Sequence, residues 1–376
     1  MPSNNYATER DAIIRQFENM RDFSWNEQLN GQFALAGANL SNFLPHIDAS
    51  AHAALFAKLL THKKLGVLEQ GSIYALERLT AEGFQGPVVR QLSRGPSIIC
   101  TFHTGSYRLL NILLGTQRIP FVLVAGEAIL SSEGLLLDRI FRGFTGSGLP
   151  TINASDPRSV FRMLRELKQG RSLVFYIDGN SGSGEATRDN SNTCIIPLLG
   201  ARVHARKGIA VLAAKAQVPV FPVVCYRPAW DDIRLKFFDP VEPALDGQET
   251  CAPALTRQLY QLAEPIITRC PEQWEGWLYL HKTAVINAGD QPAPWNGHLE
   301  TCYQLDRNSF SLLTMGKKHF LMRKNTYSSF EIGQDLYNLL DRSSALPIVP
   351  DDQEKSVITR LLQEHVLIKF KNNCRT

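Results

Sequence analysis

The hydrophobic pattern of the chain changes character twice along its length. Up to about residue 90, apolar residues recur every three or four positions, as they do over residues 53–60. This spacing is typical of amphipathic helices, and we expect three or four of them. From Val88 to Trp230 short apolar runs alternate with helical patterns, and beyond residue 300 two short runs flank Gly316. The pattern therefore predicts a helical segment, an α/β segment and a small α+β segment.

The central segment has the alternation of an α/β sheet. Its apolar, β-branched runs predict strands over residues 97–102, 121–125, 172–177, 220–225 and 233–238. Helical patterns predict helices over residues 107–114, 135–144, 158–169, 207–216 and 256–268. Sheets of this kind bind their ligands at the carboxyl ends of the strands. We therefore expect a mixed sheet, flanked by helices, with its functional residues at strand ends.

The C-terminal segment is expected to form a module of its own. Its pattern predicts a hairpin over residues 311–323, helices over 330–340 and 352–364, and a closing strand over 366–370. This order of elements is similar to that of a winged helix. A stretch with glycine and proline precedes it and reads as a linker. We therefore divide the chain into an N-terminal helical cap (1–90), an α/β domain (91–286), a linker (287–300) and a winged-helix-like α+β module (301–376).

Composition narrows the classes of function. A net charge of +4 over 376 residues is small, which disfavours nucleic acid as a partner. The seven cysteines lack CxxC spacing and the histidines fit no ligand spacing, so we expect a cytoplasmic protein with reduced thiols and no metal site. The N-terminus is polar, and the most apolar stretch, residues 208–226, is interrupted by Lys215 and two prolines. We therefore expect neither a signal peptide nor an integral membrane segment.

Residues 97–108 carry the first candidate for catalysis. His103 ends a buried strand, and Gly105 and Ser106 follow it as a turn into a helix. A histidine in this position lies where open α/β sheets bind ligands, and its imidazole accepts a proton near neutral pH, as a general base must. The alternative is a structural histidine at the end of a strand.

Asp178 is the second candidate, because it directly follows the predicted strand 172–177. The carboxyl ends of neighbouring parallel strands meet at one edge of a sheet, so Asp178 is able to face His103 there. Asp178 also opens a loop, residues 178–193, that is rich in glycine and polar residues. A loop of this length is either functional or an irregular excursion on the surface.

A basic cluster precedes the predicted helix 207–216. It contains Arg202, Arg206 and Lys207, with His204 between them. Such a cluster suits the phosphate of a phosphopantetheine arm or an acidic helix of a carrier protein. The alternative is a solvated face without a partner.

Several stretches, in the correct order, resemble a single family. They are His103-Thr-Gly-Ser-Tyr-Arg108, Leu137-Asp-Arg-Ile-Phe-Arg142, Leu164-Arg-Glu-Leu-Lys-Gln-Gly170, Phe175-Tyr-Ile-Asp178, Pro197-Leu-Leu-Gly-Ala-Arg-Val203, Gly208-Ile-Ala-Val-Leu-Ala-Ala214, Val218-Pro-Val-Phe-Pro-Val-Val224 and Pro271-Glu-Gln-Trp274. Together they resemble the lysophospholipid acyltransferase-like superfamily, and specifically its lipid A late-acyltransferase branch. The resemblance covers roughly residues 20–285. Trp274, although part of it, is expected in the core.

The resemblance implies roles for individual residues. In the family, the histidine removes a proton from an acceptor hydroxyl, and the activated oxygen attacks an acyl thioester carried on acyl carrier protein or coenzyme A. No bound cofactor is implied. Arg142 and Asp178 match family positions near the reactive centre that position the donor, unless they only form a salt bridge between two loops. We expect Gly105, Ser106 and Asn180 to border the substrate, and the basic cluster to bind the donor.

The sequence departs from the family at one decisive position. The family carries an acidic residue five positions after the histidine, where this chain has Arg108. A guanidinium there cannot orient an imidazolium and is expected to lower the pKa of His103. In one reading Asp178, or else Glu127, supplies the carboxylate. In a second, His103 acts alone on an amine acceptor and Arg108 clamps an anionic group. In a third, acyl transfer is lost and the pocket only binds.

The sequences at the two ends of the chain indicate which class of acceptor substrate to expect. The C-terminal module resembles PqqD-like domains, which capture a peptide by adding it to a sheet edge, although a winged helix for dimer contact or interdomain packing has the same pattern. Members of the lipid A branch begin with an apolar segment, whereas this chain begins with a polar one. We therefore expect a soluble acceptor, either a peptide or a small biosynthetic intermediate.

We accordingly expect an acyltransferase that moves an acyl group from a carrier-protein or coenzyme A thioester to a soluble amine or hydroxyl. Two alternatives remain open. One is a degenerate acyltransferase that binds an acyl chain or a carrier protein without catalysis. The other is a thioesterase, in which water replaces the acceptor.

Overall fold

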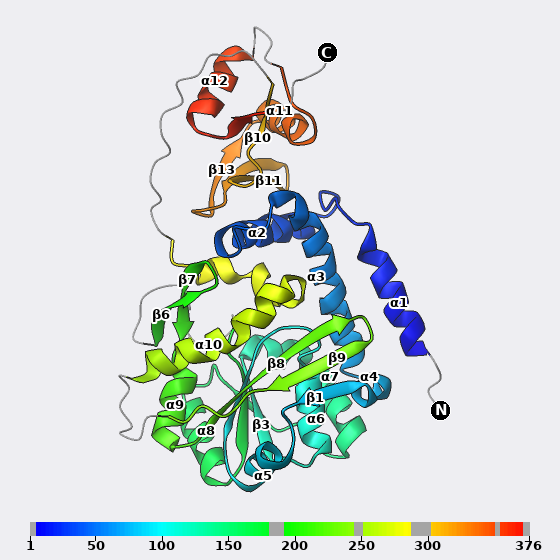
Figure 1. The fold of residues 1–376 in the computed structure, drawn as a ribbon, viewed down its shortest axis with the longest axis vertical. Coiled ribbons are helices and arrows are strands. Elements are labelled where there is room, and N and C mark those ends of the chain that lie inside the picture. Colours follow the sequence, from blue (N-terminus) through cyan, green and yellow to red (C-terminus); the bar gives the residue numbers. More distant parts are fainter. Residues whose placement is uncertain (1–4, 180–191, 244–250, 287–301, 350–353, 371–376) are drawn as a thin grey trace. The chain divides into compact units, whose positions relative to one another are not determined.

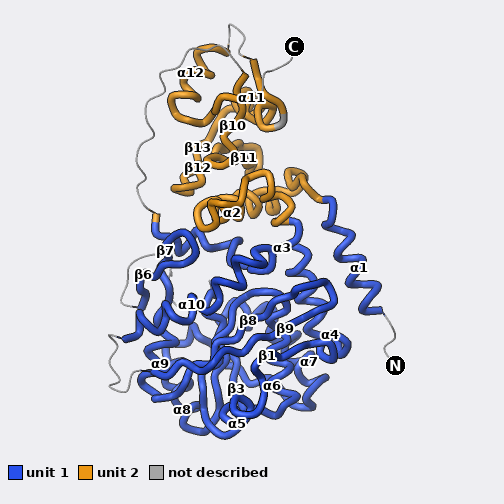
Figure 2. The backbone as a smooth tube through the Cα atoms, in the orientation of Figure 1, with its two compact units in different colours: residues 1–19, 57–285 blue, residues 20–56, 286–376 orange. Residues whose placement is uncertain are grey.

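A computed structural model describes residues 5–179, 192–243, 251–286, 302–349 and 354–370. The chain divides into two compact units (Figure 2). Unit 1 comprises residues 1–19 and 57–285, and unit 2 comprises residues 20–56 and 286–376. Each unit therefore combines segments that lie far apart in the sequence.

Unit 1 is built on a seven-stranded mixed sheet (Figure 1). The strands lie in the order β1-β9-β8-β2-β5-β3-β4, so β2 lies between β8 and β5. All neighbouring pairs are parallel except β8 and β9, which form an antiparallel hairpin. The bounds are β1 (Leu79–Glu82), β2 (Ile98–Thr101), β3 (Phe121–Ala125), β4 (Thr151–Asn153), β5 (Ser172–Tyr176), β8 (Val220–Ala229) and β9 (Asp232–Phe237).

Helices surround this sheet in unit 1 (Figure 1). They are α1 (Asn5–Glu18), α3 (Ala49–Glu69, which begins in unit 2), α4 (Ile73–Glu77), α5 (Gly86–Arg94), α6 (Leu109–Thr116), α7 (Glu127–Thr145), α8 (Ser159–Lys168), α9 (Gly208–Ala216) and α10 (Ala252–Arg269). Short 3-10 turns follow over Pro271–Gln273, Glu275–Leu278 and Leu280–Lys282. One core combines α6 with Phe141 of α7 and with the side chains that one face of the sheet presents, such as Ile99 and Val174. The mixed α/β architecture with an N-terminal helical region confirms the predicted fold class.

The predicted strands and helices of the central segment are present, but three elements differ from the prediction. Helix α7 begins at Glu127 rather than at residue 135. Strand β1 falls inside the segment predicted to be wholly helical; it is only four residues long and pairs with β9 alone. Strands β6 (Thr193–Leu198) and β7 (Ala201–Arg206) form a separate hairpin that the sequence analysis missed. Short or polar strands at a sheet edge carry too weak a hydrophobic pattern to be recognised.

Unit 2 combines helix α2 (Glu27–Phe43) with small antiparallel sheets from the C-terminal segment. These are β11-β12-β13 and β10-β14, with α11 and α12 beside them. The bounds are β10 (Tyr303–Leu305), β11 (Phe310–Met315), β12 (Lys318–Arg323), β13 (Ser328–Ile332), α11 (Gln334–Ala345), α12 (Lys355–Gln363) and β14 (Leu367–Lys369). The predicted hairpin is present as β11 and β12. The helix predicted from residue 330 begins at Gln334 instead, because residues 328–332 form a third strand on β12.

The division into units differs from the predicted domain boundaries at the N-terminus. We predicted residues 1–90 as one cap, whereas residues 20–56 group with the C-terminal segment. The reason is a face of small residues on α2: Ala34 and Ala38 pack against Leu313 and Met322. The predicted linker 287–300 lies outside the described residues. The likeness of the C-terminal segment to PqqD-like or winged-helix domains stays a prediction.

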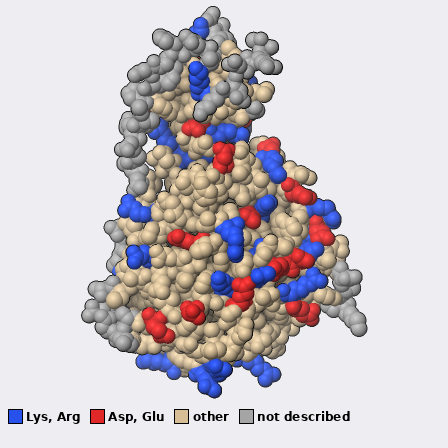
Figure 3. Space-filling view, in the orientation of Figure 1, with Lys and Arg blue, Asp and Glu red and all other residues tan. Residues whose placement is uncertain are grey.

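Within the described ranges, no helix combines the length and apolar character needed to cross a bilayer. The same ranges contain no group of three or more side chains arranged to hold a metal ion. On the face shown in Figure 3, Lys and Arg gather along the lower edge of unit 1, near α5 and α8, whereas acidic and basic side chains mix elsewhere on this unit.

Candidate active site

The turn after β2 places His103 at the carboxyl edge of the sheet. All four residues of β2 are buried, and Phe102 continues the buried run before the chain leaves the sheet. Gly105 then adopts a left-handed conformation with φ of +53°. A Cβ at Gly105 would lie 3.3 Å from Cys225 Sγ and 3.4 Å from the Tyr226 Cα atom. Only glycine combines this backbone angle with so close an approach to β8.

Asp178, which follows the neighbouring strand β5, is the hydrogen-bond partner of His103. The Nδ1 atom of His103 lies 2.7 Å from Asp178 Oδ1. The backbone N–H of His103 also donates to this carboxylate, at 3.1 and 3.0 Å from its two oxygens. The Asp178 side chain is only 3% exposed, and that of His103 is 20% exposed. A proton on Nδ1 that is held by a carboxylate leaves Nε2 as the basic nitrogen of the ring.

The surroundings raise the pKa of His103 above its ordinary value. Burial acts in the opposite direction, but the charge and hydrogen bond of Asp178, together with the charge of Glu275, outweigh it. Arg108 lowers the pKa, as we expected from the sequence, but its effect is smaller than that of Asp178. The net effect therefore favours the imidazolium that forms when His103 takes up a proton.

Two tyrosines hold the imidazole ring in place. The centroid of the His103 ring lies 4.8 Å from that of Tyr107 and 4.9 Å from that of Tyr176. The Tyr176 hydroxyl in turn accepts a hydrogen bond of 3.0 Å from the Asn111 side chain. Packing of this kind restricts the ring to one orientation and reduces its contact with water.

A cavity of about 590 Å³ opens beside His103. This volume lies within the range of about 300–1,000 Å³ that is typical of sites for small ligands. Much of its wall is apolar and comes from β3, α8 and α9, with Leu123, Met163 and Leu212 among the side chains. His103 and Arg108 lie among the polar groups of the same wall. The arrangement suits a ligand with a long apolar part and a reactive polar end.

Arg108 lines this cavity but does not contact Asp178. Its Nη2 atom lies 3.1 Å from Glu133 Oε2 on α7. Its guanidinium also lies over the ring of Tyr107, 5.0 Å from the centroid. A cation held in this way remains charged and presents a positive group beside the base.

The structure brings together only some of the other predicted site residues. Arg206 and Lys207 line the cavity with His103. Arg202 is exposed on β7. The Arg142 side chain is 60% exposed and pairs with Asp138 at 2.9 Å. Neither arginine is among the described residues that line the cavity. Asn180 lies outside the described residues.

Neither Glu127 nor Ser106 is among the described residues that line the cavity. Glu127, the second candidate partner for His103, is exposed at the start of α7 and bonds to Ser131 and Asn153. Ser106, predicted to border the substrate, is instead buried, with its hydroxyl bonded to Glu69 and Arg227. Its side chain therefore points into the protein and not into the cavity.

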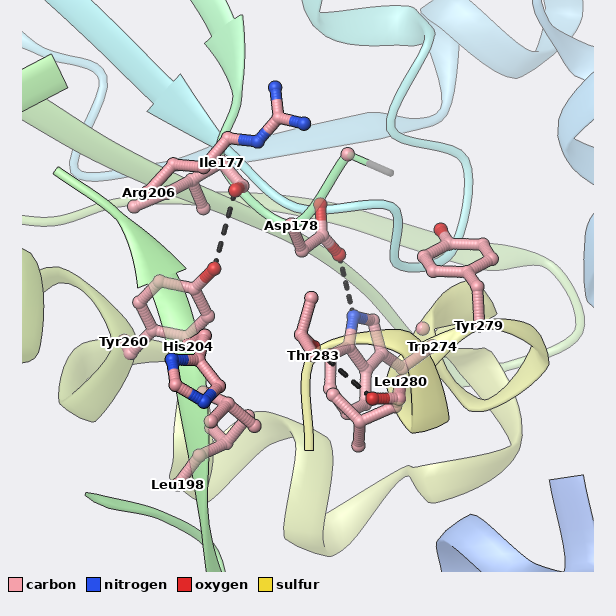
Figure 4. Close-up of a pocket in the computed structure, with 13 residues that line it drawn as sticks. Ile177, Asp178, Leu198, His204, Arg206, Tyr260, Trp274, Tyr279, Leu280 and Thr283 are labelled. Carbon is pink, nitrogen blue, oxygen red and sulfur yellow. Dashed lines mark hydrogen bonds between the residues drawn. The ribbon is translucent and has the colours of Figure 1, made fainter. Parts of the chain in front are cut away.

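Trp274, which we expected only in the core, also contacts the candidate site. It is buried, as expected, but its Nε1–H also donates to Asp178 Oδ2 at 2.6 Å (Figure 4). The next residue, Glu275, donates its backbone N–H to the His103 carbonyl at 2.9 Å. Trp274 and Asp178 are 96 residues apart, and no local pattern links them. The Pro-Glu-Gln-Trp stretch was the only signal available.

Figure 4 shows a second, much smaller cavity of about 40 Å³ against Asp178. Tyr260 lines it, and its hydroxyl donates to the Ile177 carbonyl at 3.2 Å. A volume of this size holds one or two water molecules and no substrate. The larger cavity is therefore the candidate substrate site.

Comparison with known proteins points to the same chemistry. Residues 139–283 match the family model of bacterial lipid A biosynthesis acyltransferases. No match to a curated protein was found. The matched range contains Asp178, the basic cluster and Trp274, whereas His103 and Arg108 precede it. The match supports a relationship between this chain and the acyltransferase superfamily. It also supports acyl transfer, in general terms, as the activity. Over residues 139–283, then, the chain is similar to the bacterial lipid A biosynthesis acyltransferases.

Proposed function

We propose that this protein transfers an acyl group from a thioester to a hydroxyl or amine acceptor. His103 is the general base, and Asp178 is the carboxylate that orients it. The observation that carries the proposal is the 2.7 Å contact between His103 Nδ1 and Asp178 Oδ1, beside a largely apolar cavity of about 590 Å³. The family match supports the general class of reaction.

The reaction follows from this geometry. Nε2 of His103 takes the proton of the acceptor O–H or N–H while the acceptor oxygen or nitrogen bonds to the thioester carbonyl carbon. Asp178, through Nδ1, stabilises the imidazolium that forms. The tetrahedral intermediate then collapses, the C–S bond breaks, and the leaving thiolate takes the proton from Nε2. The products are the acylated acceptor, a free thiol and neutral His103.

Asp178 supplies the carboxylate that this chain lacks at position 108. Of the readings that the sequence left open, the contact favours the one in which another carboxylate replaces the acidic residue of the family, and Asp178 rather than Glu127 is that carboxylate. Arg108 is then free of the orienting role. Its position on the cavity wall suits contact with an anionic group of donor or acceptor.

The charge of the cavity wall supports a donor that carries phosphate. Arg108, Arg206 and Lys207 contribute to the wall, and Glu133, which pairs with Arg108, is an acidic side chain among them. Phosphopantetheine, the arm shared by acyl carrier protein and coenzyme A, has an anionic phosphate and an apolar acyl end. This combination suits a wall that is basic in one part and apolar in another.

The outer face of α8 supports a carrier protein as the source of that arm. Arg158, Arg162, Arg165 and Lys168 are exposed at helical spacing, and Phe161 among them is 75% exposed. The neighbouring Ser159, Val160 and Met163 line the cavity. A basic helix with an exposed aromatic ring at the edge of the cavity suits the acidic helix of a carrier protein.

For the acceptor we keep a soluble amine or hydroxyl in the cytoplasm, either a peptide or a small intermediate. Strand β13, the exposed edge strand of the three-stranded sheet β11-β12-β13, supports a peptide, because a strand edge that pairs with no other described strand is able to add an extended segment. A small intermediate needs no such surface.

The test is thiol release from acyl thioesters of coenzyme A and of acyl carrier protein over a range of chain lengths. Wild type is compared with His103→Ala, and with His204→Ala as the matched control, because His204 lines only the smaller cavity. Each reaction is run without an acceptor and then with fractionated small molecules and peptides from a cell extract. We expect release that requires both an acceptor fraction and His103, and an acylated product identifiable by mass.

Other outcomes assign other functions. Release that requires His103 but no acceptor, with free fatty acid as the product, would identify a thioesterase. Tight binding of the thioester with no release in any reaction would identify a binding protein. Full activity in His103→Ala would exclude His103 as the base.

A further inference from the structure

A buried ionic cluster lies directly beneath the turn that carries His103. Glu69 of α3 and Arg227 of β8 form an ion pair whose side chains are 0% and 1% exposed. The Ser106 hydroxyl donates to Glu69 Oε2 and accepts from Arg227 Nη2, the latter at 2.8 Å. Tyr6 of α1 donates to the other Glu69 oxygen at 2.8 Å. Moving charged side chains out of water is unfavourable, so the burial of this ion pair needs a physical reason.

The cluster is connected to the catalytic turn through segment 273–275 as well. The side chain of Gln273 accepts from the Arg227 backbone N–H and donates to the Arg227 carbonyl, both at 2.7 Å. The Gln273 carbonyl accepts from the N–H of Gly105 at 2.9 Å. Trp274 forms an isolated bridge with Thr104, and Glu275 N–H donates to the His103 carbonyl. His103, Gly105 and Ser106 are therefore each held by a hydrogen bond to this segment or to the ion pair.

Of the side chains of residues 103–106, only that of Ser106 is hydrogen-bonded to the Glu69–Arg227 ion pair. Its hydroxyl donates to the carboxylate and accepts from the guanidinium at the same time, which a hydroxyl is able to do and a methyl group is not. Ser106 does not line the cavity, so it has no contact with a bound substrate. Glu69 and Arg227 are absent from the described cavity wall as well.

We propose that the Glu69–Arg227 pair acts through Ser106 as a positioning device that holds His103 against Asp178. The inference rests on the proposed role of His103 as the base. The pair anchors the last residue of the turn to α3 and β8, while Glu275 and Gln273 hold His103 and Gly105. The imidazole then stays within hydrogen-bond distance of Asp178 throughout the reaction, which a loosely held turn would not ensure.

Ser106→Ala and Tyr6→Phe make a matched pair of variants. Each removes one hydroxyl that donates to Glu69, but Ser106 belongs to the catalytic turn and Tyr6 belongs to α1. Two quantities are measured in each variant: the kcat and KM for acyl transfer, and the pKa of His103 by NMR titration of the isotope-labelled histidine. Melting temperature is recorded alongside them, so that a loss of stability is separated from a loss of positioning.

We expect Ser106→Ala to lower kcat roughly 10- to 100-fold with little change in KM, since a small displacement of a catalytic group has an effect of this size. The pKa of His103 should fall, because the hydrogen bond to Asp178 that raises it becomes weaker. Tyr6→Phe should leave kcat and this pKa close to the wild-type values. Should Ser106→Ala fail to fold, Ser106→Cys keeps a side chain of similar size with a weaker donor and should show the same pattern at smaller amplitude.

Unchanged kcat and an unchanged His103 pKa in the Ser106 variants would overturn the proposal. So would equal losses of kcat in Ser106→Ala and Tyr6→Phe, because the effect would then not run specifically through Ser106. The titration also separates this inference from the proposed function. If wild type transfers no acyl group, the proposed function fails, and the shift of the His103 pKa in Ser106→Ala still decides whether the cluster positions the imidazole.

Discussion

At the scale of single residues, the proposed chemistry of His103 depends on a carboxylate that lies 75 residues further along the chain. Asp178 accepts hydrogen bonds from the His103 ring, from the His103 backbone and from Trp274. With three donors around it, the carboxylate stays in one orientation. Arg108 does not compete for this role, since its guanidinium is directed to Glu133.

This arrangement makes a prediction about Arg108→Glu. A carboxylate at position 108 would face Glu133 and gain no contact with Nδ1, which Asp178 already occupies. We expect kcat/KM to fall about tenfold or more, because the like charges repel and a positive group on the cavity wall is lost. Arg108→Lys keeps the charge and should retain more of the activity. Activity preserved or improved in Arg108→Glu would mean instead that position 108 still orients the base.

The sequence was informative at this scale where a residue follows a strong strand pattern. His103 and Asp178, which the structure places within hydrogen-bond distance of each other, were both singled out because each comes directly after a buried apolar run. The role of Ser106 was misinterpreted, because a polar residue at the start of a helix suggests contact with a ligand. No local pattern reveals that its hydrogen-bond partner is a buried arginine on β8. Trp274 was assigned to the core for the same reason.

At the scale of elements, the site depends on the sharp exit of the chain from β2. Gly105→Ala tests this directly. We expect a loss of about 1–2 kcal/mol in the free energy of unfolding, because a left-handed conformation is unfavourable for alanine, and the contact of its Cβ with Cys225 adds to the loss. Gly134→Ala, in the middle of α7, is the matched control. Its Cβ would meet nothing closer than 4.0 Å. It should raise the free energy of unfolding by about 0.4–1 kcal/mol.

Urea denaturation of the two variants gives the comparison. Equal stability changes in both would contradict the role assigned to Gly105. The same element-scale reasoning explains which strands the sequence predicted. The buried strands β2, β3 and β5 have continuous apolar runs, whereas β1 and β13 are partly or largely exposed, so their patterns did not stand out.

At the scale of the whole molecule, sequence patterns could not predict that residues 20–56 group with the C-terminal segment. The Thr314 backbone N–H donates to Asn30 across a separation of 284 residues, and the small side chains of α2 that pack on β11 look like any buried helical face. Periodicity predicts that such a face is covered but not by which segment.

Surface charge allows a prediction at the same scale. Arg158→Glu/Arg165→Glu reverses two exposed cations, one at the N-terminus of α8 and one within it. Helix α8 lies at the edge of the cavity and along the basic lower edge of unit 1 (Figure 3). We expect a higher KM for an acyl-carrier-protein donor, roughly tenfold at low salt, with kcat unchanged and with the difference reduced at high salt.

Arg90→Glu/Arg94→Glu is the matched control, since it changes the net charge equally on α5, which does not line the cavity. It should leave the KM near the wild-type value. The same rise in KM for both double variants would show a general effect of net charge, and no rise in either would exclude α8 as the surface that meets the donor.

The most direct test of the central claim, that Asp178 is the carboxylate that serves His103, is the pH dependence of kcat/KM for acyl transfer in wild type and Asp178→Asn. His103 must be neutral to accept a proton, so kcat/KM should rise with pH through the pKa of His103, which Asp178 and Glu275 raise above the ordinary value. In Asp178→Asn the inflection should move to lower pH and the maximal rate should fall roughly 10²- to 10⁴-fold. Glu275→Gln should move the inflection less in the same direction. A variant Asp178→Asn that keeps both the wild-type inflection and the wild-type maximal rate would contradict the account.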